Sequence, residues 1–299
     1  MMCPVLKQHV KLACVQFSST ADKIFNVSEA RAGVIEAANA GARIVVLPEC
    51  FNAPYDMALF PQYAEILTPS PPSKDQSSTY HALSTLAKDT NVYLIGGSIP
   101  EFEPLTGKYY NTTLAFGPDG AGLGSHRKTH LFDIDIENKM TFRESDVLSP
   151  GDKLTIVELP DYGTVGLGIC YDVRFPEPAM IAARLGVFAL IYPSAFNSTT
   201  GALHWEVLAR SRALDNQVYV ALCSQALPPT GYPAWGHSII TDPNGQVMVM
   251  ANREKAIVYA ELDSEAIGQH RRQIPTSNQR RFDLYPDISQ LCTKGLGLD

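Results

Sequence analysis

Segments typical of buried strands alternate with segments typical of helices along almost the whole chain, and this order restricts the possible folds more than any other feature. Short runs rich in β-branched residues, typical of strands, lie between longer segments in which apolar residues recur at helical spacing. The predicted strands include 10–17, 43–47, 92–96, 187–192 and 218–223, and the predicted helices include 22–40, 178–185 and 202–215. Such an order is typical of an α/β fold.

Turn residues add antiparallel hairpins to this pattern. Pro118-Asp119-Gly120 separates strands expected at 109–116 and 121–127, and Asp242-Pro243-Asn244-Gly245 separates 237–241 from 246–250. Neither a repeat of fixed period nor a break in composition divides the 299 residues. We therefore expect a single domain over 1–299, with its core at about 10–285 and a basic, polar C-terminal arm at 271–299.

Charge and hydropathy exclude several classes of protein. The chain has 31 acidic and 24 basic residues, a net charge of −7, which argues against non-specific binding to nucleic acid. No apolar run approaches the roughly 18 residues of a membrane span, and the best, 186–195, contains Pro193. Lys7, His9 and Lys11 interrupt any secretory segment. The expectation is a cytoplasmic enzyme without nucleic-acid or membrane partners.

Six cysteines are scattered without a C-x-x-C pair, so most should be reduced and buried. Cys170 differs in position, because it ends the apolar segment TVGLGIC and begins a polar turn. Ligands of α/β sheets bind at such strand ends. Cys170 is therefore a candidate nucleophile, with a buried structural cysteine as the alternative on position alone.

Two charged residues also follow predicted strands. Glu49 comes after RIVVLP and is either a solvated carboxylate or a buried general base, whose pKa burial would raise. Lys128 lies in HRKTHLF and, taken alone, reads as a surface lysine. His126 and His130 have the i, i+4 spacing of zinc ligands, but no third ligand stands at a recognisable spacing. We expect no metal, and no cofactor, since dinucleotide and P-loop motifs are missing.

Taken together, these segments resemble the nitrilase superfamily of carbon–nitrogen hydrolases. The resemblance covers nearly the whole chain, to about Tyr285, and several motifs occur in the family's order. Within the superfamily, the sequence is most similar to the omega-amidase branch, on RKTHLFDID, FRES, CYDVRFPE and YPSAFN. The motifs are LPECFNAPY (47–55), GGSIPE (96–101), YNT (110–112), RKTHLFDID (127–135), FRES (142–145), LSPGD (148–152), GLGICYDVRFPE (166–177), YPSAFN (192–197), HWEVLARSRALDNQVYV (204–220) and GHSIITDPNG (236–245).

The resemblance implies a set of catalytic residues and an architecture. Glu49 matches the family's general base, Lys128 its catalytic lysine, Cys170 its nucleophile, and Glu144 the glutamate beside the lysine. The implied fold is a four-layer α-β-β-α sandwich. It also implies a homodimer or higher homo-oligomer, with helices 178–185 and 202–215 and the arm beyond Arg271 as candidate interfaces.

The implied reaction is hydrolysis of the terminal amide of a short dicarboxylic acid monoamide, such as 2-oxoglutaramate, through a thioester. Lys128 and the backbone N–H of Tyr171 are expected to face the oxyanion. Arg174 is a candidate clamp for the distal carboxylate, with an ion pair to Asp172, Glu177 or another acid as the alternative. Phe196, Thr200 and Tyr55 are candidate pocket residues, with core packing as the alternative.

Three other functions compete with this one. A sister branch of the superfamily cleaves deaminated glutathione, and its pocket must hold a longer, peptide-like tail. A catalytically silent scaffold with the same fold is less compatible with the presence of Glu49, Lys128 and Cys170. A metal-dependent amidohydrolase is the remotest of the three.

Overall fold

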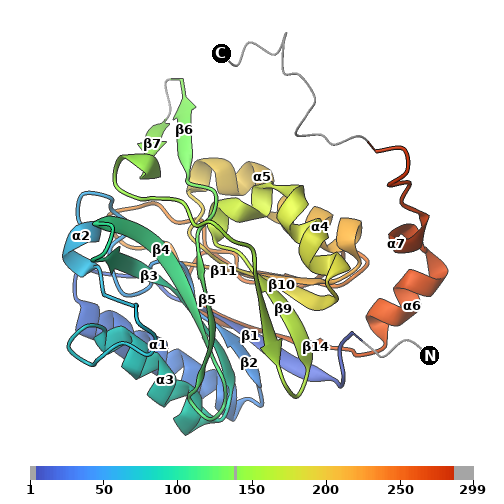
Figure 1. The fold of residues 1–299 in the computed structure, drawn as a ribbon, viewed down its shortest axis with the longest axis horizontal. Coiled ribbons are helices and arrows are strands. Elements are labelled where there is room, and N and C mark those ends of the chain that lie inside the picture. Colours follow the sequence, from blue (N-terminus) through green and yellow to red (C-terminus); the bar gives the residue numbers. More distant parts are fainter. Residues whose placement is uncertain (1–4, 138–139, 286–299) are drawn as a thin grey trace.

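Two six-stranded sheets lie face to face, and helices cover their outer faces (Figure 1). The computed structural model describes residues 5–137 and 140–285. The layers follow the order helix, sheet, sheet, helix, which confirms the predicted α-β-β-α sandwich.

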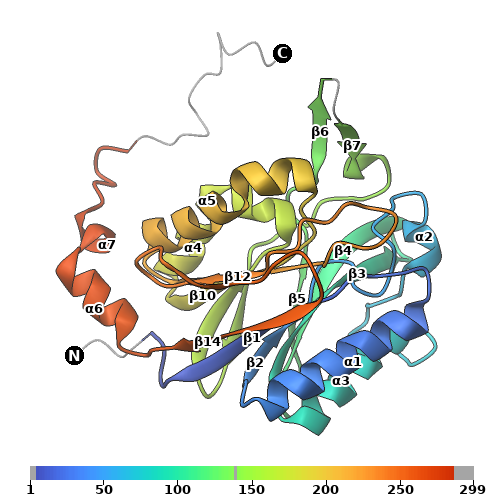
Figure 2. The same cartoon turned by 180° about the vertical axis from the view of Figure 1, so that it is seen from behind.

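The first sheet takes most of its strands from the N-terminal half of the chain. Helices α1 (Lys23–Asn39) and α3 (Ser78–Thr90) pack on its outer face (Figure 2). Gly33 allows α1 to lie close to the sheet, because a Cβ there would come within 2.3 Å of Val15 Cγ1. The strand order is β14 (Ala256–Leu262), β1 (Val10–Gln16), β2 (Ile44–Val46), β3 (Tyr93–Glu103), β4 (Lys108–Phe116), β5 (Gly122–Arg127).

The second sheet comes from residues 155–250. Helices α4 (Pro176–Arg184) and α5 (Ser198–Asn216) cover its outer face. The strand order is β13 (Val247–Met250), β12 (Ile239–Thr241), β11 (Tyr219–Ser224), β10 (Val187–Ser194), β9 (Gly163–Leu167), β8 (Thr155–Leu159).

The main apolar core lies between the two sheets. Leu12 and Ile44 of the first sheet belong to the same buried cluster as Phe188 and Ile191 of the second. Each sheet packs on its other face against helices, so its central strands are buried on both sides. This explains why these strands read as continuous apolar runs rather than as alternating ones.

Strand direction brings the carboxyl ends of several strands to one edge. Strands β1, β2 and β3 are parallel, and β5 has the same direction because it pairs antiparallel with β4, which pairs antiparallel with β3. In the second sheet β9, β10 and β11 are also parallel. The residues that follow β2, β5, β9 and β10 can therefore meet at this edge.

Some elements differ from the prediction. The strand before Cys170 ends at Leu167, and Cys170 begins a short 3₁₀ turn, η2 (Cys170–Arg174). A projecting hairpin of β6 (Asp133–Ile136) and β7 (Met140–Arg143) was not predicted, although each of its four-residue strands alternates polar and apolar residues. Two short helical segments were also missed: α2 (Phe60–Tyr63) and η1 (Glu144–Asp146).

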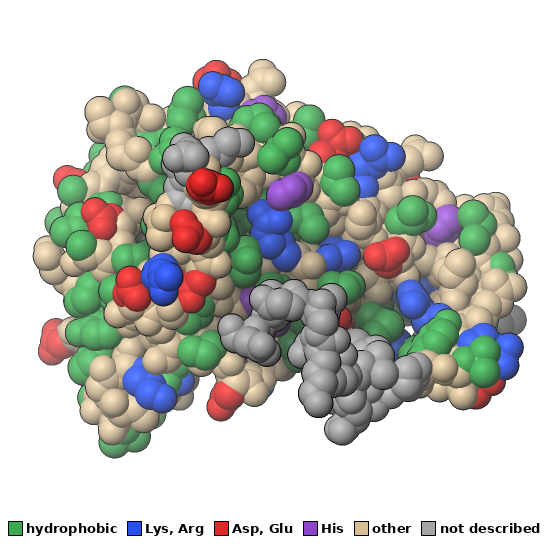
Figure 3. Space-filling view, turned by 90° about the horizontal axis from the view of Figure 1, so that it is seen from above, with side chains coloured by type: hydrophobic (Ala, Val, Ile, Leu, Met, Phe, Trp, Pro, Cys, Tyr) green, Lys and Arg blue, Asp and Glu red, His purple; other side chains and the backbone are tan. Residues whose placement is uncertain are grey.

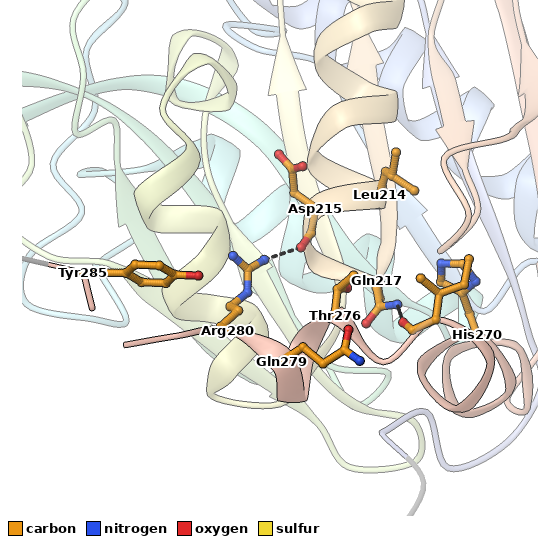
Figure 4. Close-up of a pocket in the computed structure, with 9 residues that line it drawn as sticks. Leu214, Asp215, Gln217, His270, Thr276, Gln279, Arg280 and Tyr285 are labelled. Carbon is orange, nitrogen blue, oxygen red and sulfur yellow. Dashed lines mark hydrogen bonds between the residues drawn. The ribbon is translucent and has the colours of Figure 1, made fainter. Parts of the chain in front are cut away.

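The described part of the predicted arm, 271–285, contains the end of α6 (Ala266–Gln273) and all of α7 (Thr276–Gln279), at one side of the sandwich (Figure 1). Two side-chain hydrogen bonds connect it to the end of α5 (Figure 4): Arg280 donates to the Asp215 carbonyl, and Gln217 donates to the Ile274 carbonyl. They border a cavity of about 490 Å³. Residues 286–299 of the arm, with Cys292, and Cys3 near the N-terminus lie outside the described residues.

The described residues contain no helix long and apolar enough to cross a membrane. On the face drawn in Figure 3, acidic and basic side chains are interspersed with apolar ones. Cys14, Cys50, Cys170 and Cys223 are buried, and each has a free thiol.

Candidate active site

The structure brings Glu49, Lys128 and Cys170 together at the shared edge of the two sheets. Glu49 follows β2, Lys128 follows β5, and Cys170 follows β9. All three side chains are buried. Lys128 Nζ lies 2.9 Å from Glu49 Oε1, and the charges of Glu49 and Lys128 both act on the Cys170 thiol.

The backbone at Cys170 is in an uncommon conformation. Its φ is +45°, in the left-handed region that non-glycine residues rarely adopt. Such a conformation persists only where surrounding contacts hold it. At this turn, the backbone N–H of Ile169 donates to Asp172 Oδ2 at 2.8 Å. The Cys170 sulfur also accepts a hydrogen bond from the backbone N–H of Ala195, at the end of β10.

Asp172 connects the cysteine turn to the segment that carries Lys128. Its Oδ1 accepts hydrogen bonds from the Thr129 hydroxyl at 2.8 Å and the His130 backbone N–H at 2.9 Å. His126 Nε2 lies 3.2 Å from Oδ2, and His130 Nδ1 lies 2.7 Å from Oδ1. These contacts hold the Asp172 pKa well below its usual range, although burial alone would raise it.

The two histidines with zinc-like spacing thus both contact Asp172. In the part of the chain that the structure describes, no three His, Cys, Asp or Glu side chains form a cluster that could hold a metal ion. The loop after β2 is fixed in a different way: Gly97 has φ +61°, and a Cβ there would lie 2.2 Å from the Pro48 carbonyl oxygen. Gly97 therefore lets β3 pass close to the residue before Glu49.

Lys128 lies between two carboxylates. Besides Glu49, it contacts Glu144 Oε1 at 2.8 Å. Glu144 is itself fixed, since its Oε1 accepts from the Tyr55 hydroxyl and its Oε2 from the Phe132 backbone N–H, both at 2.7 Å. Lys128 is therefore held in place on both sides.

Burial and charge shift the pKa values of all three central groups. Burial raises the pKa of Glu49, although the charge of Lys128 opposes this. Burial alone would lower the pKa of Lys128, but Glu144 and Glu49 outweigh it and raise that pKa well above its usual value. Burial and then the charge of Glu49 raise the pKa of the Cys170 thiol. At neutral pH the Cys170 thiol is therefore protonated and Lys128 is an ammonium group.

Glu49 keeps one oxygen available. Its Oε1 accepts from Lys128 and, at 2.8 Å, from Asn111 Nδ2, whereas its Oε2 accepts from no N–H or O–H group of the described residues. The remaining partner of this carboxylate is the Cys170 thiol. Leaving a buried carboxylate oxygen unpaired is costly. A free acceptor beside a thiol is what a general base needs.

A narrow cavity of about 10 Å³ opens next to the Cys170 sulfur. Four residues predicted for the substrate site line it: Tyr171, Arg174, Phe196 and Thr200. Phe132, Ala195 and Tyr232 complete the lining. Tyr55, also predicted for the pocket, is not part of the lining and instead hydrogen-bonds Glu144. The larger cavity beside the arm contains none of these residues (Figure 4).

Arg174 carries a positive charge without an acidic partner. The ion pair with Asp172 or Glu177, considered from sequence, does not form, since Asp172 is occupied by its own contacts. No acidic side chain of residues 5–137 or 140–285 lies in ion-pair contact with Arg174. Its guanidinium lies over the Phe196 ring at 4.9 Å, its NH1 contacts His204 Nδ1 at 3.1 Å, and its buried Nε is unpartnered.

Sequence reasoning missed several residues that surround the site. Asn111 lies in the YNT motif, which was noted without a role. Asp172 follows Cys170 by two residues, but its partners are 40 or more residues away in sequence. Ala195 contributes a backbone N–H, which no side chain reveals. Tyr232 lies in a loop rich in proline and glycine, where no periodic pattern identifies it.

Comparison with known proteins shows the family to which the chain belongs. The family model for carbon–nitrogen hydrolases matches residues 11–272. Omega-amidase NIT3 of Saccharomyces cerevisiae is 50% identical over 290 residues, which cover 95% of this chain and 98% of that protein. Omega-amidase NIT2 of Homo sapiens is 50% identical over 276 residues, 92% of this chain and 96% of that protein.

A solved structure shows the same likeness in three dimensions. The crystal structure of Saccharomyces cerevisiae Nit3, a member of branch 10 of the nitrilase superfamily, matches with a TM-score of 0.85 at 47% identity. The match covers 93% of this chain and 98% of that one.

Proposed function

This chain belongs to the carbon–nitrogen hydrolase family, and from that premise we propose that Glu49, Lys128 and Cys170 are its catalytic residues. Family membership confirms the predicted enzyme class, a hydrolase of carbon–nitrogen bonds, and the predicted superfamily. The observation that carries the assignment is a buried lysine held between two carboxylates, with one carboxylate oxygen free beside the thiol.

The reaction we assign is that of an omega-amidase. It hydrolyses the terminal amide of a short dicarboxylic acid monoamide to the dicarboxylate and ammonia. The names of relatives at 50% identity support this activity. The unpaired cation of Arg174 in the cavity beside Cys170 supports a substrate with a second, negatively charged end.

In the first half of the reaction, Glu49 takes the thiol proton while the Cys170 sulfur bonds to the amide carbon. The carbonyl oxygen becomes an oxyanion, which the Lys128 ammonium group stabilises. As the carbon–nitrogen bond breaks, Glu49 passes its proton to the departing nitrogen. Ammonia leaves, and the acyl group remains on Cys170 as a thioester.

In the second half, Glu49 takes a proton from water, and the resulting hydroxide attacks the thioester carbon. The carbon–sulfur bond breaks, and Glu49 returns the proton to the sulfur. Glu144 takes no proton in this scheme. It keeps Lys128 charged and in place, since it binds the ammonium group and is itself held by Tyr55 and Phe132.

The cavity beside Cys170 is small. At about 10 Å³ it has room for roughly one water, so an amide enters only when lining side chains move. The preference for a short monoamide over deaminated glutathione therefore rests on the relatives at 50% identity, which are omega-amidases.

We also propose that the enzyme is a homo-oligomer. Helices α4 and α5 expose apolar side chains at helical spacing on their outer surfaces: Ile181, Leu185, Leu203 and Val207. A second copy of the chain packed against these helices would remove them from water.

The proposed reaction is tested by ammonia release from 2-oxoglutaramate. The wild-type enzyme should release ammonia, and Cys170→Ala should release none above background. Cys14→Ala, which changes a buried cysteine outside the site, is the matched control and should keep activity. Mass spectrometry of a slow substrate should find the acyl group on Cys170. Ammonia release by Cys170→Ala, or an acyl group on another cysteine, would contradict the mechanism.

A further inference from the structure

The hydroxyl group of Tyr232 has no function in the reaction as described so far, although it lies inside the cavity that contains Cys170. The hydroxyl oxygen is buried and has no hydrogen-bond partner among the described residues. Buried polar groups are almost always paired, so an unpaired one needs an explanation. In a cavity built for a substrate, the missing partner can be the substrate itself.

The ring of Tyr232 is held against the side chains that support the catalytic groups. It packs on the Tyr55 ring, with centroids 4.5 Å apart, and its centroid lies 6.2 Å from that of Phe142. Tyr55 hydrogen-bonds Glu144, which binds Lys128. The Tyr232 ring is therefore connected to the lysine through packing and two hydrogen bonds.

The loop that carries Tyr232 is fixed as well. The Trp235 backbone N–H donates to the Phe196 carbonyl at 2.7 Å, and the Ser198 backbone N–H donates to the Pro233 carbonyl at 3.0 Å. Both contacts join the loop to the segment between β10 and α5, which contributes Phe196 to the cavity lining. The orientation of the hydroxyl is thus determined by packing rather than by a hydrogen bond of its own.

The surroundings of the hydroxyl place it near the reacting end of the substrate. Tyr232 lines the same small cavity as Cys170, and its ring packs on Tyr55, whose hydroxyl donates to the Glu144 carboxylate that binds Lys128. Burial raises the pKa of Tyr232 well above its usual value, so its hydroxyl keeps its proton at neutral pH; the nearby Glu49 and Glu144 act in the same direction, and Lys128 opposes them.

We propose that the Tyr232 hydroxyl is a catalytic group that hydrogen-bonds the scissile carboxamide while it reacts with Cys170. This inference rests on the proposed amidase function. The tyrosine acts as a neutral hydrogen-bonding group: no bond to its oxygen forms or breaks, and the proton transfers remain with Glu49. Lys128 and Tyr232 then share the stabilisation of the carboxamide, and Arg174 binds the opposite end.

The test is Tyr232→Phe, which removes one oxygen and keeps the ring. We expect kcat/KM to fall on the order of 100-fold, the usual effect of removing one such hydrogen-bonding group. The fall should be the same for a carboxylate-bearing amide and a neutral amide, because both share the carboxamide. The melting temperature should stay the same or rise, since the hydroxyl has no partner to lose. Tyr63→Phe, which removes a hydroxyl bonded to the Ala21 carbonyl, is the matched control and should keep wild-type kcat/KM.

Three outcomes would overturn the inference. Unchanged kcat/KM in Tyr232→Phe would show that the hydroxyl does not touch the reacting group. A fall limited to the carboxylate-bearing amide would place it at the distal end. Reduced activity in proportion to a lowered melting temperature would make it a structural group. The proposed function fails separately, if the wild-type enzyme releases no ammonia from any of the amides.

Discussion

At the residue scale, the site consists of one buried cation between two buried anions. Lys128 and its partners Glu49 and Glu144 are all removed from water. Taking charges out of water is expensive, and the cost is recovered only when the contacts are close and the remaining hydrogen-bonding positions are filled. Glu144 meets that condition, whereas Glu49 keeps Oε2 free. Glu49, whose carboxylate does not meet the condition, is the residue to which we assign proton transfer.

The raised pKa of Glu49 predicts the acid side of the pH profile. The base must be ionised to take the thiol proton, so activity is present above its pKa and is lost as the pH falls through it. Because burial raises that pKa above the ordinary value of 4.5, the acid limb of kcat/KM should lie above pH 4.5. Initial rates of ammonia release across pH measure it. An acid limb of kcat/KM at or below pH 4.5 would contradict the role of Glu49 as the buried base.

Arg174 should determine the preference for a carboxylate. In Arg174→Lys, the charge remains but the planar, two-pronged donor is lost. We expect KM for 2-oxoglutaramate to rise about tenfold or more, as in the loss of one charge-assisted hydrogen bond of about 1.5–3 kcal/mol, with little change for a neutral amide. Steady-state kinetics with both substrates measure the difference.

A matched control separates this effect from a general effect of the substitution. Arg210→Lys makes the same change on the exposed surface of α5, where the side chain pairs with Glu206. It should change neither KM value. An equal rise in KM for the charged and the neutral amide in Arg174→Lys would argue against a carboxylate clamp.

At the scale of elements, short turns rather than helices or long strands position the reactive groups. The η2 turn carries Cys170, and its Asp172 reaches back to the segment after β5 that carries Lys128. The nucleophile and the lysine belong to different sheets, so this one carboxylate fixes their relative position. The arrangement also explains why His126 and His130 flank the lysine: both contact the same carboxylate.

Asp172→Asn should therefore destabilise the protein. The variant loses a buried charge with several donors, which should cost about 3 kcal/mol or more of unfolding free energy at pH 7. The pKa of Asp172 is lowered in the folded state, so its contribution is complete above the ordinary value of 3.8 and is lost as the pH falls towards the lowered pKa. The difference between wild type and variant should shrink in the same direction. Urea unfolding at several pH values measures it.

The control for this prediction is an aspartate in an exposed position. Asp283→Asn removes a surface carboxylate that pairs with Arg281 and should leave the urea midpoint unchanged. If Asp172→Asn also left the midpoint unchanged, Asp172 would not connect the two segments in the way the contacts indicate.

At the scale of the whole molecule, the sandwich leaves one helical layer with an apolar outer surface. Leu203 and Val207 are 64% and 62% exposed and lie one turn apart on α5. Ile181 of α4 and Leu185, directly after that helix, have the same spacing. Because α4 and α5 are in contact, we take these four exposed side chains as the candidate interface.

We expect Val207→Glu to shift the protein towards the monomer, because a second copy would have to bury the new charge. Analytical ultracentrifugation at several concentrations measures the shift. Ile24→Glu on α1 is the control, since Ile24 is 84% exposed on the other helical layer, and it should leave the assembly unchanged. A wild-type monomer at all concentrations, or an unchanged assembly in Val207→Glu, would rule out this surface as the interface.

Much of the architecture was readable from local patterns. The helices expected at 22–40 and 202–215 correspond to α1 and α5, and the predicted hairpins correspond to β4–β5 and β12–β13. These elements are encoded by periodicity and turn residues that lie within a few positions of one another. The β6–β7 hairpin was missed although its short strands alternate polar and apolar residues. The 3₁₀ turn at Cys170 lacks a periodic signal, and contacts of Asp172 with the segment after β5 hold it.

Some residues of the candidate site were predicted from the sequence, and others became visible only in the structure. The order of the motifs led to the prediction of Glu49, Lys128, Glu144 and Cys170, and the contacts of Lys128 with both glutamates are consistent with the proposal. Asn111, Asp172 and Tyr232 were not identified, because their contacts join residues far apart in the chain. Arg174 had two open interpretations, and the ion pair was wrong because Asp172 already has other partners.

The amino-acid sequence alone therefore determined the α/β class, the order of the elements and the family, since all three depend on residue types at short spacing or on motifs in a fixed order. Only the tertiary structure decided which charges meet, which carboxylate oxygen stays free, and that a tyrosine hydroxyl remains unpaired beside the thiol. The reason is that burial and hydrogen-bond partners depend on distances between strands that are remote in sequence, and those distances exist only once the two sheets have packed.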